Sequence, residues 1–336
     1  MFRANPAHTG VQDSKDVRKE PQRYWRLGTE DRVLSSPAVA NGIVYAGSFD
    51  GGIYAVTVDG KRVWRFSTNG DFLSSPAVVD GVVYAGSYGG SLFALDALTG
   101  EVKWTAAIDP DGSSPTVVDG VVYIGSADGN LYALNAADGS VRWRVATGAG
   151  IFTSPAVADG VVYCASSDGF LYAIDAASGG IRWRANVGAK YSSPAVANGT
   201  VFVGSTFNSF YALDAGTGAV RWAITTGDSV LSSPAVANGA VYLGSNDGNL
   251  YAVHAETGDS IWAYQTGGQV ISSPALTKNL VYVGSMAGIV VAVDRTTGQL
   301  QWQSTTDAGV YSSPAVVDET IYVGCDDGRL YALRDQ

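Results

Sequence analysis

Apolar residues in this chain occur in short runs separated by polar turn residues, and the pattern repeats about every forty residues. In residues 234–268, PAVANGAVYLGSNDGNLYAVHAETGDSIWAYQTGG, four runs rich in β-branched and aromatic residues are separated by Asn-Gly, Asn-Asp-Gly and Thr-Gly. Such runs between turn pairs predict antiparallel strands joined by hairpins. Helical periodicity is absent from the sequence, so the pattern predicts an all-β protein.

Tryptophan and proline mark the repeat. The eight tryptophans are 39 or 40 residues apart, and eight of the eleven prolines follow the same period. A fixed period near forty is typical of closed or stacked repeat proteins, and four antiparallel strands per period are typical of one propeller blade. The marker residues are Trp25, Trp64, Trp104, Trp143, Trp183, Trp222, Trp262 and Trp302, with Pro37, Pro76, Pro115, Pro155, Pro194, Pro234, Pro274 and Pro314.

The two ends of the chain carry complementary parts of one repeat. The segment around Trp25 matches a fourth strand without its first three, and residues 312–333 supply three strands without a fourth. We expect the ends to combine into one blade, because closure removes free sheet edges. The predicted fold is an eight-bladed β-propeller of four-stranded antiparallel blades, closed by the strand around Trp25. Residues 1–20 are predicted to be a lead-in segment, and residues 21–336 a single propeller domain.

A motif precedes most of the tryptophans. It reads Ala-Leu-Asp-Ala-Leu-Thr-Gly-Glu-Val-Lys-Trp at 94–104, recurs at 133–143, 173–183, 212–222, 252–262 and 292–302, and is one residue shorter at 55–64. It resembles the tryptophan-docking motif of quinoprotein-like (PQQ-repeat) propellers, and residues 2–10 resemble the lead-in of that family. The resemblance implies that the tryptophan of each blade packs against the neighbouring blade. It extends to the lipoprotein propeller of outer-membrane protein assembly.

The same family includes quinone-dependent alcohol dehydrogenases and sensor domains of bacterial kinases, so fold alone does not select a function. In the dehydrogenases the quinone stacks between a tryptophan and a disulfide of adjacent cysteines, with calcium nearby. Here every tryptophan belongs to the repeat, and the only cysteines, Cys164 and Cys325, are far apart in sequence. We therefore expect two free, buried cysteines, no cofactor and no PQQ-dependent dehydrogenase activity.

Charge and hydropathy exclude further classes of function. The net charge is −10 and the sequence pI is about 4.6, which disfavours a nucleic-acid partner. No stretch approaches 18 apolar residues, so we expect no transmembrane segment. The first ten residues lack an apolar signal core, which leaves two compartments open. These are a bacterial or archaeal cytoplasm as the sequence stands, or the periplasm or extracellular space if a signal peptide was removed. We expect a monomer.

Most acidic and histidine residues fit turns better than catalysis. His254 replaces an aspartate of the docking motif, and His8 belongs to the lead-in, where we expect it to order that segment. With two histidines in separate regions, a histidine-based metal site is not predicted. Aspartates that precede glycine or lie in the docking motif favour local hydrogen bonding in turns. They are Asp50, Asp128, Asp168, Asp247 and Asp327, and Asp96, Asp175, Asp214 and Asp294.

Two loops break the period. The count from tryptophan to the next repeat proline is 12 in six blades but 11 before Pro115 and Pro194. Both shortened loops are expected on the face of the central funnel. The first contains Asp109 and Asp111 where other repeats carry pairs such as Val-Leu, and the second contains Lys190 and Tyr191. These four are the candidate catalytic residues: a carboxylate as general base, and a cation or phenol that stabilises negative charge.

Irregular residues in neighbouring loops add a candidate binding surface. They are mostly aromatic, with a methionine and a few polar or charged groups. An apolar concavity with few polar groups is the usual make-up of a small-molecule site, although apolar residues also fill the inner strands of ordinary repeats. The candidate ligand-binding residues are Arg32, Phe49, Phe72, Tyr88, Phe152, Phe207, Asn208, Met286, Tyr311 and Asp326.

Three functions remain open at this level. The first is a non-catalytic binding or scaffold propeller that engages a protein partner or a small apolar ligand through the funnel face. The second is a cofactor-independent enzyme, of isomerase or cyclase type, acting on an apolar molecule in the funnel. The third is a designed or consensus-like repeat protein without an evolved function, although the two shortened loops are irregular for a consensus design.

Overall fold

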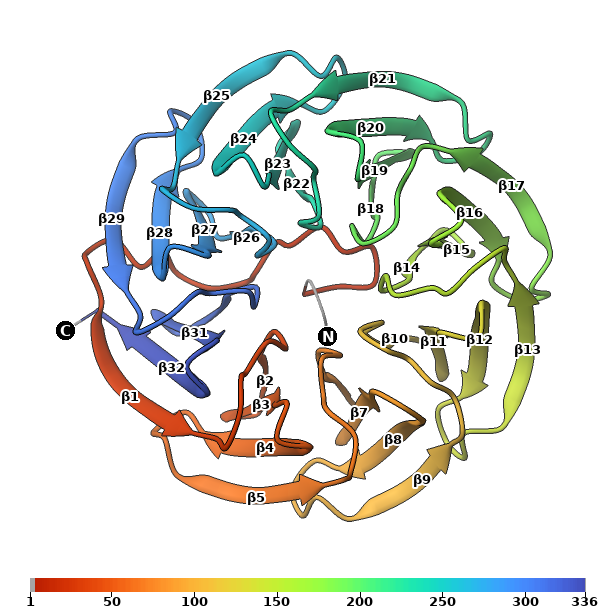
Figure 1. Cartoon of the computed structure of the whole chain (residues 1–336), viewed down its shortest axis with the longest axis horizontal. Helices are drawn as coiled ribbons and strands as arrows, with labels where there is room; N and C mark the ends of the chain where they lie inside the picture. Colours follow the sequence, from red (N-terminus) through yellow and green to blue (C-terminus); the bar gives the residue numbers. More distant parts are fainter. Residues whose placement is uncertain (1–3, 336) are drawn as a thin grey trace.

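Eight sheets stand around a central channel like the blades of a propeller (Figure 1). The computed structural model describes residues 4–335, which form thirty-two strands, four to each antiparallel sheet. This confirms the predicted all-β, eight-bladed propeller. No residue in this range belongs to a helix, so no helical membrane span is present there.

The bounds of the strands follow the repeat. Blades 1–4 contain β2 (Ala38–Ala40), β3 (Ile43–Gly47), β4 (Gly52–Thr57), β5 (Arg62–Ser67), β6 (Ala77–Val79), β7 (Val82–Ser87), β8 (Ser91–Asp96), β9 (Val102–Ala106), β10 (Thr116–Val118), β11 (Val121–Gly125), β12 (Asn130–Asn135), β13 (Val141–Ala146), β14 (Ala156–Ala158), β15 (Val161–Ala165), β16 (Phe170–Asp175) and β17 (Ile181–Asn186). Blades 5–8 contain β18 (Ala195–Ala197), β19 (Thr200–Gly204), β20 (Ser209–Asp214), β21 (Val220–Thr225), β22 (Ala235–Ala237), β23 (Ala240–Gly244), β24 (Asn249–His254), β25 (Ser260–Gln265), β26 (Ala275–Leu276), β27 (Leu280–Ser285), β28 (Ile289–Asp294), β29 (Leu300–Thr305), β30 (Ala315–Val317), β31 (Thr320–Cys325), β32 (Arg329–Arg334) and β1 (Gln22–Gly28).

The burial of each strand reflects its distance from the axis. The second strand of a blade, such as β11 (VVYIG), is buried along its whole length because both of its faces pack against neighbouring blades. The outermost strand, such as β13 (VRWRVA), alternates between exposed and half-buried residues because one face meets solvent. The hydrophobic core is therefore divided into clusters between adjacent blades. Cys164 and Cys325 lie in these clusters as free thiols, as expected.

Strand β1 closes the ring, as predicted. It pairs antiparallel with β32, from Gln22 opposite Arg334 to Gly28 opposite Arg329. Figure 1 shows this N-terminal strand at the outer edge of the blade formed by the C-terminal strands. Asp307, in the loop before β30, forms salt bridges of 3.2–3.3 Å with three arginines at the closure, Arg23, Arg26 and Arg329. The first and last strands are therefore joined by main-chain pairing and by charge.

The tryptophans lock each blade to the next. The indole N–H of Trp104 in blade 2 donates a 2.9 Å hydrogen bond to the Ala136 carbonyl, in the turn between β12 and β13 of blade 3. The indole also covers Gly139, where a Cβ atom would lie 2.6 Å from the ring. Six further tryptophans repeat this contact at 2.8–3.0 Å, with the carbonyl 32 or 33 residues ahead. The carbonyl belongs to the blade that follows, so the packing implied by the family resemblance is confirmed.

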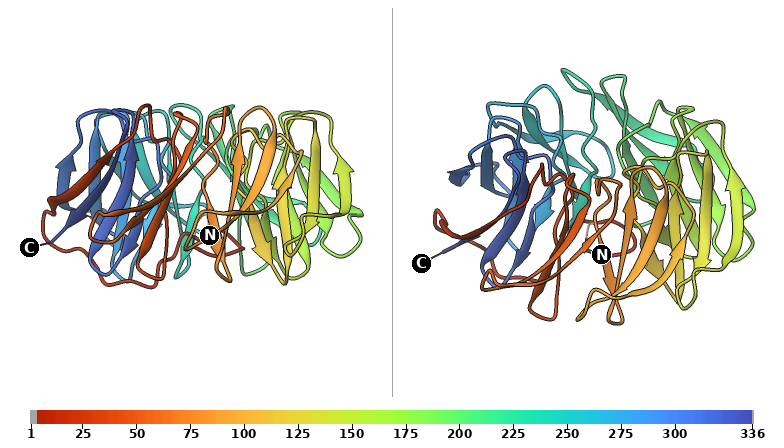
Figure 2. Two further views of the ribbon diagram at one scale, coloured as in Figure 1. Left: turned by 90° about the horizontal axis from the view of Figure 1, so that it is seen from below. Right: turned by 60° about the horizontal axis from the view of Figure 1, so that its bottom comes forward.

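The lead-in segment, residues 4–17, lies across the end of the channel near the turns that follow the inner strands. The carbonyls of Pro6, Ala7, Thr9 and Gly10 accept hydrogen bonds from inner strands β14, β18, β22 and β26 in turn, at 2.7–2.9 Å. His8 is completely buried and contacts the Thr116 hydroxyl and the Pro194 carbonyl at 3.1 and 3.3 Å. The side chain therefore orders the segment, as expected. Figure 2 shows the red lead-in segment towards one face of the disc.

Candidate functional site

A Ser-Ser-Pro step begins each inner strand, with Thr153 replacing the first serine in blade 4. The first hydroxyl fixes the blade internally. In blade 6 the Ser232 hydroxyl accepts the Gly244 N–H at 2.7 Å and donates to the Gly244 carbonyl at 3.0 Å. The N–H contact recurs in all eight blades at 2.7–3.4 Å. This hydroxyl joins the start of the first strand to the end of the second.

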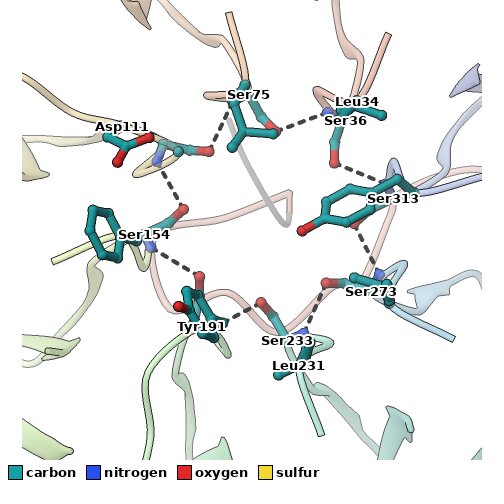
Figure 3. Close-up of a pocket in the computed structure, with 17 residues that line it drawn as sticks. Leu34, Ser36, Ser75, Asp111, Ser154, Tyr191, Leu231, Ser233, Ser273 and Ser313 are labelled. Carbon is teal, nitrogen blue, oxygen red and sulfur yellow. Dashed lines mark hydrogen bonds between the residues drawn. The ribbon is translucent and has the colours of Figure 1, made fainter. Parts of the chain in front are cut away.

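The second serine joins the blades to one another. The N–H of Ser193 donates to the hydroxyl of Ser233 in the next blade, and Ser233 donates likewise to Ser273. Eight such bonds of 2.9–3.1 Å form a closed circle around the channel (Figure 3). We call these residues the serine ring. They are Ser36, Ser75, Ser114, Ser154, Ser193, Ser233, Ser273 and Ser313.

The hydroxyls of the serine ring face a cavity, and each of them can form a further hydrogen bond. Six of the eight serines are 5 % exposed or less. Each oxygen accepts one N–H, but no acceptor for the hydroxyl proton is present among residues 4–335. A serine hydroxyl has one proton and two lone pairs, so each ring member can make a further polar contact. The ring therefore forms a polar floor.

An apolar collar lies one residue before each Ser-Ser pair and surrounds the floor. Floor and collar together line a cavity of about 440 Å³, which we call the funnel cavity. Its size is within the range of ligand pockets, about 300–1,000 Å³. The collar consists of Leu34, Leu73, Phe152, Tyr191, Leu231, Ile271 and Tyr311.

Blade 3 interrupts the collar. Its shortened loop places Gly112 at the collar position, and Asp111 becomes the one charged side chain among the described residues that line the cavity (Figure 3). Pro110 packs against Gly86 as Ile151 packs against Gly125, so the core contact survives the deletion. Asp111 adopts a φ of +35°. Aspartate tolerates this left-handed region better than most residues, which suits the tight turn.

Aromatic rings occupy the next two blades. Phe152 and Tyr191 are stacked, with ring centroids 6.4 Å apart and planes 13° from parallel. Tyr191 belongs to the second shortened loop and is 54 % exposed, so it reaches beyond the collar towards solvent. Tyr311 completes the aromatic part of the wall and is 37 % exposed. The wall is therefore aromatic on the side of Asp111 that faces blades 4 and 5, and aliphatic at Leu73 on the other side.

The electrostatic environment of the cavity is negative. Burial, and then the nearby charge of Asp109, raises the pKa of the Asp111 carboxyl above its usual value. Burial also raises the pKa of the Tyr311 phenol, with smaller contributions from Asp326 and Tyr191. Neither group has a lysine, arginine or histidine among the described residues of the lining. The cavity thus contains a carboxyl group whose charge is not compensated inside it.

The other predicted catalytic residues do not reach the cavity. The Asp109 carboxylate accepts the Gly89 N–H at 3.1 Å and so belongs to the contact between the loops of blades 2 and 3. Lys190 is half-buried beside Tyr191 but is not part of the cavity wall. Of the four candidates, Asp111 and Tyr191 line the cavity together. The arrangement therefore does not place a base and a cation opposite each other across a substrate.

The predicted ligand-binding residues divide into three groups. Phe152 and Tyr311 line the cavity. Phe72 is fully buried in the core between blades 1 and 2, two positions before the Ser-Ser pair, and so does not line it. The remaining residues lie outside the cavity wall. They are Arg32, Phe49, Tyr88, Phe207, Asn208, Met286 and Asp326.

Several of these outer residues form a rim of their own on loops between the second and third strands. The Arg32 guanidinium lies over the Phe49 ring, 4.8 Å from its centroid. Phe207 is 70 % exposed and Tyr88 is 57 % exposed, which is unusual for aromatic side chains. The rim therefore offers aromatic contact surface outside the cavity.

The residues that sequence reasoning missed are the serine ring and the aliphatic part of the collar. The doubled serine before each repeat proline was the available signal. Because serine is common in turns, its recurrence alone does not indicate a binding site. The repeated aspartates behave as predicted. The Asp128 carboxylate, for example, accepts the Asn130 N–H and the Tyr132 hydroxyl at 2.9 and 2.6 Å. Across residues 4–335, no group of three or more His, Cys, Asp or Glu side chains is placed to hold a metal ion.

The sequence matches a known protein family along nearly all of its length. The family model for outer membrane protein assembly factor BamB matches residues 18–112, 108–191, 167–312 and 269–336. No curated protein matches the chain.

Solved structures confirm the architecture. BamB from Moraxella catarrhalis is 19 % identical, with a TM-score of 0.81 over 94 % of this chain and 100 % of that one. The computationally designed Ika8 protein is 18 % identical, with a TM-score of 0.82 over 94 % and 100 %. The quinohemoprotein alcohol dehydrogenase of Comamonas testosteroni is 16 % identical, with a TM-score of 0.83 over 99 % of this chain and 79 % of that one. At these identities the likeness concerns the fold.

Proposed function

The chain belongs to the family of outer membrane protein assembly factor BamB, and we propose that it is a non-catalytic binding protein whose funnel cavity holds a small molecule. The observation that carries the proposal is the construction of the cavity. A polar floor of buried hydroxyls lies beneath an apolar collar, in a space of about 440 Å³. Concave apolar sites with a few convergent polar groups are the usual sites of small ligands.

The contacts favour binding over catalysis. General acid–base chemistry requires a base within hydrogen-bonding reach of the reacting proton and a group that stabilises the developing charge. Asp111 is the single carboxylate of the described lining, and Asp109 and Lys190 lie outside it. The serine hydroxyls accept hydrogen bonds from main-chain N–H groups, and within the described residues none of them is hydrogen-bonded to the Asp111 carboxylate, so they are not activated nucleophiles. The cavity therefore supplies recognition without a reaction centre.

A thermal-shift screen of metabolites tests this function. We expect at least one compound to raise the melting temperature of the wild-type protein, because a ligand that binds only the folded state stabilises it. In the variant Leu231→Trp, the larger side chain fills the collar, and the stabilisation should disappear while the variant stays folded. The matched control is Leu98→Trp, since Leu98 is 69 % exposed on an outer turn. A screen without any stabilising compound, or equal stabilisation of both variants, would reject the proposal.

The exposed aromatic rim supports a second candidate, which is binding of a protein partner on the same face. Exposed aromatic residues such as Phe207 and Tyr88 are enriched at protein interfaces. A partner that covers the rim would lose affinity in the Phe207→Ser variant. A small molecule confined to the funnel cavity would bind that variant as it binds the wild type. Parallel pull-down and thermal-shift measurements on Phe207→Ser and Leu231→Trp therefore separate the two candidates.

A further inference from the structure

We propose that the funnel cavity selects an organic ammonium ion: a small molecule with an apolar body and a positively charged amine held near Asp111. This inference rests on the proposed function and deepens it by assigning the charge of the ligand. It follows from three features of the cavity wall, namely an uncompensated carboxylate, adjacent aromatic faces and a floor of neutral oxygen atoms.

The carboxylate of Asp111 lacks a partner within the described residues. No hydrogen bond or salt bridge reaches it from any of them, although it is half-buried. The charge that acts on the Asp111 carboxyl is that of Asp109, which is also negative. Among the described residues, Lys190 lies outside the lining and the Arg32 guanidinium covers the Phe49 ring. A partly buried carboxylate without a counter-charge attracts a cation, and it repels an anion at the same place.

Aromatic faces lie in the two blades that follow Asp111, and Leu73 lies on its other side. Gly112 adds no side chain to the collar, and a Cβ atom placed there would lie 3.1 Å from the Leu73 side chain and 3.9 Å from the main-chain oxygen of Phe152. The stacked rings of Phe152 and Tyr191 then continue the wall around the axis. Cations bind over aromatic faces because the quadrupole of the ring makes each face electrostatically negative. The carboxylate and the rings therefore favour the same charge.

The serine ring is compatible with an ammonium group. The hydroxyls of Ser114 and Ser154 flank Asp111 on the floor, and each accepts one main-chain N–H. The second lone pair of each oxygen is available to an N–H donor of the ligand, because the hydroxyl proton can rotate away. An ammonium group at this point would contact both the carboxylate and neutral oxygens, while its apolar body would lie against the collar.

Three matched probes test the charge assignment by isothermal titration calorimetry: 4-phenylbutylammonium, 4-phenylbutan-1-ol and 4-phenylbutanoate. Their apolar bodies match to within one methylene group, and their end groups are positive, neutral and negative. We expect the ammonium probe to bind about tenfold more tightly than the alcohol, and the carboxylate probe to bind most weakly. In Asp111→Asn the preference for the ammonium over the alcohol should fall to about twofold or less. Asp228→Asn, in an exposed position of the loop before β22 and outside the cavity lining, is the control and should keep the wild-type preference.

The outcomes separate this inference from the function on which it rests. If the alcohol binds as tightly as the ammonium in the wild type, or if Asp111→Asn keeps the full preference, the charge assignment is wrong and the binding function stands. If none of the three probes binds while the metabolite screen finds a neutral or sugar-like ligand, the assignment is also wrong. If neither the probes nor the screen gives binding, both proposals fail. Circular dichroism and the melting temperature establish that each variant is folded.

Discussion

The indole N–H of Trp302 donates a 2.6 Å hydrogen bond to the carbonyl of Val17, a residue that precedes it by 285 positions. In the other blades this carbonyl comes from the turn between the third and fourth strands of the next blade. Blade 8 has no such turn, because its third strand, β32, is the last strand in the sequence and its fourth strand, β1, is the first. Val17 replaces the missing carbonyl, and its own N–H donates to the Tyr282 hydroxyl at 2.8 Å. The lead-in thus completes the eighth docking site.

Truncation tests this role of the lead-in. A chain that begins at Arg18 should have a free energy of unfolding lower than one that begins at Ser14. The difference should be about 1–3 kcal/mol, because the buried indole and phenol lose their partners. Trp302→Phe should then destabilise the longer chain more than the shorter one, whereas Trp222→Phe should destabilise both equally. Urea denaturation of the six proteins gives these values, and an equal effect of Trp302→Phe in both chains would contradict the assignment.

The serine ring predicts the cost of removing one hydroxyl. In Ser233→Ala the Ser193 N–H loses its acceptor at 3.1 Å in a buried position, so the free energy of unfolding should fall by about 1–3 kcal/mol. The control is Ser167→Ala, since the Ser167 oxygen is buried and has no hydrogen-bond partner within residues 4–335. Its removal should be neutral or stabilising. Chemical denaturation compares the two, and equal losses would show that the ring bond contributes little.

The contact between glycine and tryptophan predicts that alanine substitution destabilises the protein to a different extent at two glycines with similar backbone conformations. Gly139 and Gly199 have φ angles of +73° and +68°. A Cβ atom at Gly139 would lie 2.6 Å from Trp104, whereas one at Gly199 would meet nothing within 4 Å. Gly199→Ala should therefore cost about 1–2 kcal/mol from backbone strain alone. Gly139→Ala should cost about 1–3 kcal/mol more from overpacking. Melting curves with equal losses for both variants would argue against tight docking.

Asp111 predicts a pH-dependent effect on stability. Its folded-state pKa is raised, so ionisation destabilises the folded protein at neutral pH, and protonation removes this penalty as the pH falls. Asp111→Asn should increase the free energy of unfolding at pH 7, and the gain should vanish at about pH 2.5, where the carboxyl is protonated in both the folded and the unfolded state. Asparagine also tolerates the positive φ.

Asp214→Asn is a control that should change the stability in the opposite direction. Hydrogen bonds from Arg221 and Thr217 lower the pKa of the Asp214 carboxyl to about 2. The stability that this carboxylate contributes is present above the usual aspartate pKa and is lost as the pH falls towards 2. Asp214→Asn should therefore lower the free energy of unfolding at pH 7. Urea titrations at both pH values check the two signs, and a loss of stability in Asp111→Asn at pH 7 would contradict the environment described for Asp111.

The fold could be predicted in detail because each repeat carries the same physical markers. A tryptophan that needs a carbonyl and a glycine beneath its ring, and turns that need Asn-Gly or Asp-Gly, leave a pattern that a single sequence displays. The role of Val17 was not predictable in this way. It makes both hydrogen bonds with main-chain atoms, and main-chain hydrogen bonding does not depend on residue type.

The candidate site was predictable in part. The two shortened loops pointed to Asp111 and Tyr191, which line the cavity together. Phe72 lies close to the Ser-Ser-Pro step, as Phe152 does, and the sequence therefore predicts a ligand-binding role for both residues. The two are out of register by one residue, however, and adjacent residues of extended chain point in opposite directions. Phe72 therefore enters the core and Phe152 the cavity. Asp109 and Lys190 lie in the correct loops, but sequence spacing does not reveal which side chains the loop turns inward.

The eight hydrogen bonds of the serine ring all run in the same rotational sense, each from one blade to the next along the chain. Dipoles of equal size arranged head to tail around a circle cancel, so the N–H···O bonds produce no net field along the channel axis. In this respect the ring differs from a helix terminus, where aligned dipoles add and favour one sign of charge. The floor of the cavity therefore favours neither sign of charge. The preference for a cation over an anion comes from Asp111, at the position where blade 3 departs from the eightfold symmetry.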